Sequence, residues 1–129
     1  MRVEQTRLPR AWFEQIPCSL TVCDKDYTIL YMNEKSASVS SKEGGEALVG
    51  RNLLDCHPPI AQKKLREVMG SRKPNVYTSE KNKVKKMVFQ CQWRSEGRIG
   101  GLLEVSFELP RRVPNHVRRP EPGGLRQRD

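Results

Sequence analysis

The alternation of apolar and polar side chains toward the C-terminal end constrains the fold most. The odd positions of residues 87–93 are all apolar, and residues 104–109 alternate between polar and apolar types. Because successive side chains of a β-strand point to opposite faces, each segment predicts a strand with one buried face. A sheet with one buried face needs helices over that face. The residues predicted to form it are Met87, Phe89, Cys91, Trp93, Val105, Phe107 and Leu109.

Three further β-rich segments complete the predicted sheet. A tight polar connection at Asp24-Lys25-Asp26 predicts a hairpin, and the Ser-Glu-Gly sequence at residues 95–97 predicts a turn. The sequence therefore predicts an α+β fold, in which a five-stranded antiparallel sheet carries helices over one face. The expected strands are Cys18–Cys23, Tyr27–Met32, Val76–Glu80, Lys86–Trp93 and Ile99–Leu109.

Helical segments are expected at the N-terminus and between the second and third strands. Leu8, Trp12 and Ile16 recur every four residues, which predicts a short helix that packs an apolar stripe against the domain. Residues 34–49 are small and polar and predict short helical turns. Residues 59–69 predict an amphipathic helix. Its expected buried side chains are Ala61, Leu65, Val68 and Met69.

The size and charge of the chain favour one folded domain with a basic tail. A chain of 129 residues is long enough to bury a single core. The formal net charge is +9, and six arginines against two acids place +4 of it in residues 110–129. That segment offers little apolar area to offset the entropy of ordering. We expect an N-terminal extension over residues 1–9, a domain over residues 10–110 and a flexible basic tail over residues 111–129.

Cysteine usage and hydropathy indicate a cytoplasmic protein. The four cysteines form no Cys-x-x-Cys pair, and the N-terminus lacks the apolar stretch of a secretory signal. No apolar run approaches the roughly 18 residues that a membrane span requires. We therefore expect a soluble protein whose cysteines are reduced and serve as small buried hydrophobic residues.

Three segments, in the expected order, resemble signatures of the PAS domain family. Residues Tyr27–Asn33 resemble the second PAS strand, which typically ends in an asparagine. Leu48–Arg51 resembles the Gly-Arg step before the next helix, and Gly97–Val105 resembles the closing hairpin and last strand. Within the family, Gly50–Pro58 is most similar to small stand-alone bacterial PAS proteins with a Cys-His-Pro segment. The resemblance covers about residues 10–110 and implies a sensor for signal transduction that binds a small ligand or a protein partner.

The resemblance also implies a homodimer and a pocket between helices and sheet. PAS domains as a class bind haem, flavin, carboxylic acids or no ligand, so no cofactor is assigned. Alternatively, the same side chains fill the core, and Asn33 bonds to backbone at the strand end. The candidate pocket residues are Tyr31, Asn33, His57, Leu65, Met69, Met87, Phe89, Cys91 and Trp93.

His57 carries the main alternative function. Imidazole is the usual ligand of haem iron, which makes a haem- or metal-dependent redox or gas sensor the alternative. A histidine before two prolines is also suited to fix a loop by hydrogen bonds to backbone carbonyls, and we favour that interpretation. Cys56 could act as a nucleophile only if its side chain and that of His57 converged, and adjacent side chains usually point apart. We expect a buried thiol there.

No motif in the sequence indicates an enzyme. Gly-x-Ser-x-Gly, His-Glu-x-x-His, P-loop and paired-carboxylate arrangements are absent, so we predict no catalytic residues and no metal. Lys81, Lys83, Lys85 and Lys86 form a basic cluster without interleaved aromatic residues, which we interpret as a solvated turn. We therefore expect neither a nucleic-acid nor a membrane partner. A further alternative is a ligand-free domain that dimerises through the N-terminal helix and the sheet.

Overall fold

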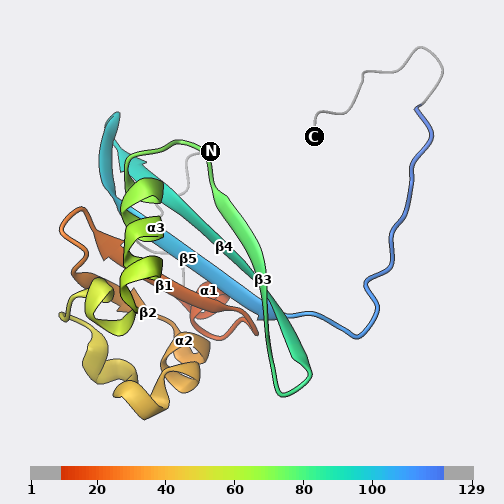
Figure 1. Cartoon of the computed structure of the whole chain (residues 1–129), viewed down its shortest axis with the longest axis horizontal. Coiled ribbons are helices and arrows are strands. Elements are labelled where there is room, and N and C mark those ends of the chain that lie inside the picture. Colours follow the sequence, from red (N-terminus) through yellow and green to blue (C-terminus); the bar gives the residue numbers. More distant parts are fainter. Residues whose placement is uncertain (1–9, 121–129) are drawn as a thin grey trace.

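The computed structural model describes residues 10–120, which contain one sheet and a set of short helices (Figure 1). The five strands are β1 (Ser19–Asp24), β2 (Ile29–Met32), β3 (Asn75–Lys81), β4 (Val84–Ser95) and β5 (Arg98–Glu108). The α-helices are α1 (Ala11–Glu14), α2 (Glu34–Val39) and α3 (Pro59–Met69). The 3-10 turns are η2 (Ser41–Glu43), η3 (Gly45–Leu48) and η4 (Leu53–Cys56).

The sheet joins the N-terminal and C-terminal hairpins. Its strand order is β2-β1-β5-β4-β3, and every neighbouring pair is antiparallel. The last strand in sequence therefore lies at the centre of the sheet. Helix α3 and the crossover from α2 to η4 lie on one side of it (Figure 1). The predicted α+β class, with helices over one face of a five-stranded antiparallel sheet, is confirmed.

Two-residue turns set the register of both C-terminal hairpins. Asn82-Lys83 connects β3 to β4, and Glu96-Gly97 connects β4 to β5. All four turn residues have positive φ, the backbone geometry that fits the twist of the paired strands. Lys81, Lys83 and Lys85 are exposed around the first turn. The lysine cluster thus surrounds a solvated hairpin turn, as interpreted from the sequence.

Helix α3 begins and ends where the sequence predicts. Pro59 occupies its first turn, where a backbone N–H has no partner within the helix. Leu65 and Val68 are buried on the side that faces the sheet. With 11 residues, α3 is the longest helix described. Within residues 10–120, no helix has the length and apolar character needed to cross a membrane.

The N-terminal helix is shorter and more exposed than predicted. Helix α1 makes a single turn, and the Trp12 side chain is 63% exposed. Leu8 lies outside the described residues. The predicted buried stripe was wrong for the residues that can be seen, because one helical turn cannot align side chains four residues apart. Phe13 makes the contact instead, edge-on to the ring of Tyr31 with 5.7 Å between ring centroids.

Strands β4 and β5 turn their more polar side to the helices. Val88 and Gln90 are buried, and Gln92 Nε2 donates a hydrogen bond to the backbone oxygen of Met69 in α3. The prediction of which side is buried was therefore wrong. Alternation shows which residues share a side of a strand, but not which side the helices cover. The residues that instead face away from the helices are Met87, Phe89, Cys91, Trp93, Val105 and Phe107.

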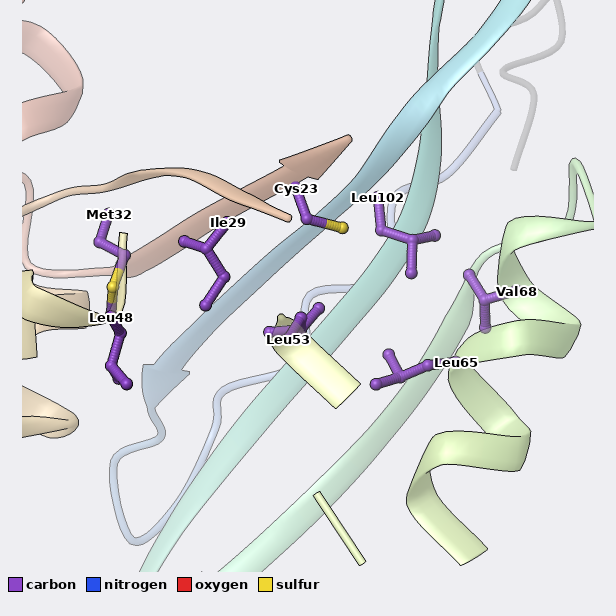
Figure 2. Close-up of a cluster of buried hydrophobic side chains, with 8 residues drawn as sticks. All are labelled: Cys23, Ile29, Met32, Leu48, Leu53, Leu65, Val68 and Leu102. Carbon is purple, nitrogen blue, oxygen red and sulfur yellow. The ribbon is translucent and has the colours of Figure 1, made fainter. Parts of the chain in front are cut away.

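The apolar core lies between the helices and the β1–β2–β5 part of the sheet. Figure 2 shows the cluster extending from Met32 and Leu48 at one end to Leu65 and Val68 of α3 at the other. Its apolar side chains come from β1, β2, β5 and the helical segments, so β4 contributes little to it. The buried cluster consists of Cys23, Ile29, Met32, Leu48, Leu53, Leu65, Val68 and Leu102.

The opposite side of the sheet, which we call the outer face, is apolar. Phe107 is 36% exposed there and the others are half-buried. Near the β4–β5 turn, a Cβ on Gly100 would come within 2.0 Å of the Trp93 ring, so that position requires glycine. The outer face consists of Leu20, Val22, Met87, Phe89, Cys91, Leu103, Val105 and Phe107.

The chain beyond β5 leaves the domain. Residues 110–120 contain no helix or strand, their side chains are exposed, and Figure 1 shows this segment leading away from the sheet. All helices and strands of the described part fall within residues 10–110. The extension over residues 1–9 and the last nine residues of the expected tail lie outside the described range. The three predicted chain regions, including the flexibility of residues 111–129, stay predictions.

Candidate functional site

Two cavities lie between the helices and the polar side of the sheet. The smaller, which we call the inner cavity, has a volume of about 220 Å³ and lies between β1, β2, β5 and the segment from α2 to η4. Four core residues form its apolar wall: Ile29, Met32, Leu48 and Leu53. Its polar groups come from Thr21, Ser40, Glu43, Cys56, His57 and Glu104.

The second cavity lies beneath α3. This α3 cavity has a volume of about 370 Å³ and is bordered by Ala61, Lys64 and Leu65 of the helix and by Asn75 and Gln90 of the sheet. His57 borders both cavities. A more open groove of about 690 Å³ continues between α3 and the start of β3. The helix-facing side of the sheet is therefore incompletely filled along much of its length.

A row of hydrogen-bonded side chains crosses this side of the sheet. Asn75 Nδ2 donates to Gln90 Oε1 at 2.9 Å, and Gln90 Nε2 donates to Glu104 Oε2 at 2.7 Å. Gln90 is only 4% exposed, so the row is anchored in a buried residue. These bonds fix the Glu104 carboxylate at the wall of the inner cavity and connect it to the edge strand β3.

The inner cavity is acidic, although the chain as a whole carries a formal charge of +9. Glu104 and Glu43 lie on its wall, and no lysine or arginine among residues 10–120 does. Among residues 10–120 the only ion pair joins Lys64 to Glu67 at 3.5 Å. Burial and then the charge of Glu104 raise the pKa of the Tyr77 hydroxyl, which lines the α3 cavity. The negative charge of Glu104 thus affects the α3 cavity as well as the inner cavity.

Cys56 is exposed, which corrects the expectation of a buried thiol. It ends a single 3-10 turn, which is too short to cover its own last residue. Partial burial of the sulfur, and then the charges of Asp55 and Glu43, raise the pKa of the Cys56 thiol. A raised pKa keeps a thiol protonated at neutral pH and makes it a poor nucleophile. Of the other cysteines, Cys23 is buried, and Cys18 and Cys91 are half-buried.

His57 makes the hydrogen bond that a loop anchor would make. Its Nδ1–H donates to the backbone oxygen of Leu53 at 2.9 Å, since a carbonyl oxygen can only accept. Gln62 Nε2 holds the same segment by donating to the backbone oxygens of Leu54 and His57, both at 2.9 Å. The bond at Nδ1 leaves Nε2 as an acceptor or metal ligand. In the described part of the chain, no three His, Cys, Asp or Glu side chains are grouped to hold a metal ion.

Asn33 has a structural role that uses its whole side chain. It is fully buried, and its Oδ1 accepts hydrogen bonds from the backbone N–H groups of Leu20 and Ser36, both at 3.0 Å. Its Nδ2 donates to the backbone oxygens of Phe13 and Cys18, both at 2.8 Å. The expected bonding to backbone at the strand end is therefore present. No donor or acceptor of this amide is left for a ligand.

Of the nine predicted pocket residues, two border the cavities described above. His57 borders both cavities, and Leu65 borders the α3 cavity. Met69 packs against the core, and Tyr31 donates a hydrogen bond to Glu14 Oε2 away from the cavities. The remaining predicted residues lie on the other side of the sheet from the helices, namely Met87, Phe89, Cys91 and Trp93.

Sequence reasoning missed the polar wall of the inner cavity. Gln90 and Glu104 occupy strand positions that were interpreted as facing solvent. The signal appears only once the register is known, because Thr21 pairs with Glu104 and Glu104 pairs with Gln90 across three neighbouring strands. Three polar residues in one cross-strand row on the helix-covered side indicate a polar site.

A family model and several solved structures match the chain. The model for the PAS fold matches residues 13–74, which run from α1 through α3 and supply most of the wall of the inner cavity. No curated protein is detectably similar to the chain in sequence.

Three solved structures of Vibrio cholerae proteins have the same fold. A sensory box sensor histidine kinase is 18% identical, with a TM-score of 0.59 over 77% of this chain and 87% of that one. The Aer2 receptor, described as a dual PAS-haem oxygen sensor, is 16% identical, with a TM-score of 0.57 over 72% and 95%. VqmA in complex with ligand and DNA is 15% identical, with a TM-score of 0.63 over 84% and 52%. VqmA is also described as a dimer.

The strand order, the crossover of short helices and the family match agree with the resemblance seen in Tyr27–Asn33 and Gly50–Pro58. The closer likeness to small stand-alone bacterial proteins with a Cys-His-Pro segment stays a prediction. The solved structures similar to this fold include a sensor kinase and an oxygen sensor. The chain has the PAS fold, and its residues 13–74 match the model of that family.

Proposed function

We propose that this PAS domain is a cytoplasmic, non-enzymatic sensor that binds a small ligand in the inner cavity and reports its occupancy to a partner protein or a second copy. One observation carries the proposal: the cavity combines an apolar wall with polar groups held in place by hydrogen bonds. Small-molecule sites have this composition. Likeness to proteins described with haem or a bound ligand adds support.

The dimensions of the inner cavity indicate the size of the ligand. A cavity of roughly 150 Å³ is large enough to bind benzene. At about 220 Å³, the inner cavity has room for one ring with a short substituent. Three 3-10 turns, whose hydrogen-bond geometry is poorer than that of an α-helix, form the helical side of the cavity. Ligand binding would favour one packing of this segment over another.

Native mass spectrometry of the gently purified protein tests the proposal. We expect a bound mass of small-molecule size that dissociates when the protein unfolds. Ser40→Phe, which places a ring at the cavity wall, should abolish that mass. Ser38→Phe is the matched control, because Ser38 is an exposed residue of α2 that does not border the cavity. A bare protein mass, or equal retention by both variants, would contradict a ligand in this cavity.

The outer face favours homodimerisation as a second function. Its eight apolar residues lie side by side on β1, β4 and β5, on the side of the sheet away from α2 and α3. Contiguous apolar surface of this kind marks interaction sites. A second copy is the occupant we propose, since an apolar sheet face is complementary to itself across a twofold axis. Exposed Trp12 and Phe13 of α1 extend the same apolar surface past Tyr31.

Sedimentation velocity over a range of protein concentrations tests the dimer. Phe107→Glu should shift the protein to monomer, because it places a charge in the apolar contact. Ile60→Glu is the control, since Ile60 is 82% exposed on α3, on the other side of the sheet. A wild-type protein that stays monomeric at high concentration would exclude this mode. A dimer that persists in Phe107→Glu would place the contact elsewhere.

A further inference from the structure

Three of the six polar residues around the inner cavity, Glu43, His57 and Glu104, offer it only acceptors of hydrogen bonds, whereas Thr21, Ser40 and Cys56 can also donate. Glu104 and Glu43 contribute carboxylates, which accept and cannot donate when ionised. His57 uses its Nδ1–H on the backbone oxygen of Leu53, so the neutral ring has only the acceptor Nε2 left to offer. The charged and aromatic polar groups of the cavity wall therefore offer lone pairs to a ligand.

Glu104 is the group with the most unused capacity. A carboxylate offers about four acceptor sites. Within residues 10–120, Gln90 is the only side chain that donates a hydrogen bond to the Glu104 carboxylate. The single ion pair in this part of the chain joins Lys64 to Glu67, so Glu104 has no ion-pair partner within it. The half-buried position of Glu104 limits how well water can solvate it. A ligand that donates hydrogen bonds, above all a cationic one, would occupy the free acceptor sites of the Glu104 carboxylate.

The position of this charge relative to the apolar wall defines the shape of the ligand. Glu104 projects from β5 on the sheet side, while Leu48 and Leu53 come from the 3-10 turns on the opposite side. Figure 2 shows Leu48, Met32 and Ile29 gathered at one end of the core cluster. A ligand with a charged end and a compact apolar body would satisfy both parts of the cavity.

We propose that the ligand is a small organic cation: a protonated amine on a single-ring or short-chain apolar body. The inference rests on the proposed ligand-binding function and specifies its ligand class. By proportion to the benzene-sized cavity, the volume accommodates roughly nine non-hydrogen atoms. The amine is held by Glu104 inside the cavity and by Glu43 at its exposed rim. The same two charges disfavour a carboxylate ligand, because no lysine or arginine among residues 10–120 borders the cavity.

Three probes of nearly equal size and different charge test the ligand class. Phenethylamine is a cation, phenethyl alcohol is its neutral counterpart and phenylacetate is an anion. Isothermal titration calorimetry at neutral pH should give phenethylamine an affinity about tenfold higher than phenethyl alcohol, a difference of about 1.4 kcal/mol. Phenylacetate should bind more weakly than the alcohol.

A matched pair of variants assigns the preference to one carboxylate. Glu104→Gln removes the charge but keeps an oxygen that can accept from Gln90 Nε2, so the fold should be preserved. It should reduce the preference for the amine over the alcohol to about twofold or less. Glu108→Gln is the control, because Glu108 is an exposed residue on the same side of β5 and does not border the cavity. It should leave the preference unchanged.

The outcomes separate the ligand class from the function. If phenylacetate or the alcohol binds as tightly as the amine, and Ser40→Phe abolishes that binding, the proposed charge preference is wrong and the proposed ligand site stands. If no probe binds at millimolar concentration, or Ser40→Phe binds all three as the wild type does, both proposals are contradicted. An amine preference that survives Glu104→Gln also overturns the assignment.

Discussion

Asn33 joins three parts of the fold through one amide. Its four hydrogen bonds reach Phe13 in α1, Cys18 and Leu20 at the start of β1, and Ser36 in the first turn of α2. Each bond replaces a contact with water that burial has removed, and a buried partner left unsatisfied costs about 1–3 kcal/mol. The asparagine that ends the second strand of the sequence signature is therefore explained by backbone satisfaction.

Asn33→Ala should lower the free energy of unfolding by about 2–4 kcal/mol, because it leaves one buried and three partly buried backbone groups without partners. Asn33→Asp should be at least as costly at neutral pH, since a carboxylate would face the backbone oxygens of Phe13 and Cys18. Urea denaturation measures both values. Asn52→Ala is the control: Asn52 caps η4 in the same way but is exposed, and about 1 kcal/mol is expected. Equal losses of unfolding free energy in Asn33→Ala and Asn52→Ala would contradict the role of Asn33 in joining the three parts of the fold.

Tyr31 should titrate unusually late. Burial, and then the hydrogen bond that it donates to Glu14, raise the pKa of Tyr31 to about 12. An acid whose pKa is raised on folding stabilises the fold in its protonated form, so this contribution is present below about pH 10 and lost as the pH rises toward 12. Glu14→Gln should bring the pKa of Tyr31 closer to 10. Carbon NMR of labelled tyrosines, with Tyr31→Phe for assignment, measures the shift, and an unchanged pKa in Glu14→Gln would contradict the contact.

His57→Ala should cost about 1 kcal/mol of stability, through loss of the bond to the Leu53 oxygen, without changing the absorption spectrum. If His57 were instead an axial ligand, the wild-type protein produced with adequate haem would show a Soret band that the variant loses. Visible spectra of the two proteins, recorded beside a urea titration, distinguish these cases. A haem band that depends on His57 would promote the haem-sensor alternative.

At the scale of elements, sequence patterns predicted the bounds of helices and strands that are determined by local chemistry. Helix α3 has the predicted bounds, since Pro59 favours a helix start and Pro74 prevents continuation soon after it. The strand segments were also placed within a few residues. The inward side of β4 was predicted wrongly, because its apolar alternation is equally compatible with helices on either side. The side of the sheet that the helices cover is determined by long-range packing, in which Leu65 and Val68 of α3 join Leu102 of β5 in the core cluster.

The two sides of β4 give a mutational test of this orientation. Gln90→Ala should cost about 1–3 kcal/mol, since it leaves the Asn75 amide and the Glu104 carboxylate without their shared partner. Phe89→Ala, on the outer face, should cost no more than this in the monomer, although a core phenylalanine usually costs about 3–5 kcal/mol. Denaturant titrations at low protein concentration give both values. A much larger loss for Phe89→Ala would restore the orientation expected from the sequence.

At the scale of the whole molecule, the two proposed functions use opposite sides of the sheet. The helix-covered side is polar and incompletely filled, which suits the proposed ligand, and the outer face is apolar, which suits the proposed contact with a second copy. The sequence was sufficient to predict the fold class and to single out His57. It could not show the cavity wall, because Thr21, Gln90 and Glu104 are far apart in the chain and meet only through strand register.

Methyl NMR of the full chain, titrated with phenethylamine, tests most directly that the ligand site lies between the helices and the polar side of the sheet. We expect shifts at the methyl groups of Ile29, Leu48 and Leu53, which line the inner cavity. The methyl groups of Leu103 and Val105 on the outer face should remain unchanged at constant protein concentration. Shifts confined to Leu103 and Val105, or no shift at Ile29, Leu48 and Leu53 up to saturation of the probe, would contradict it.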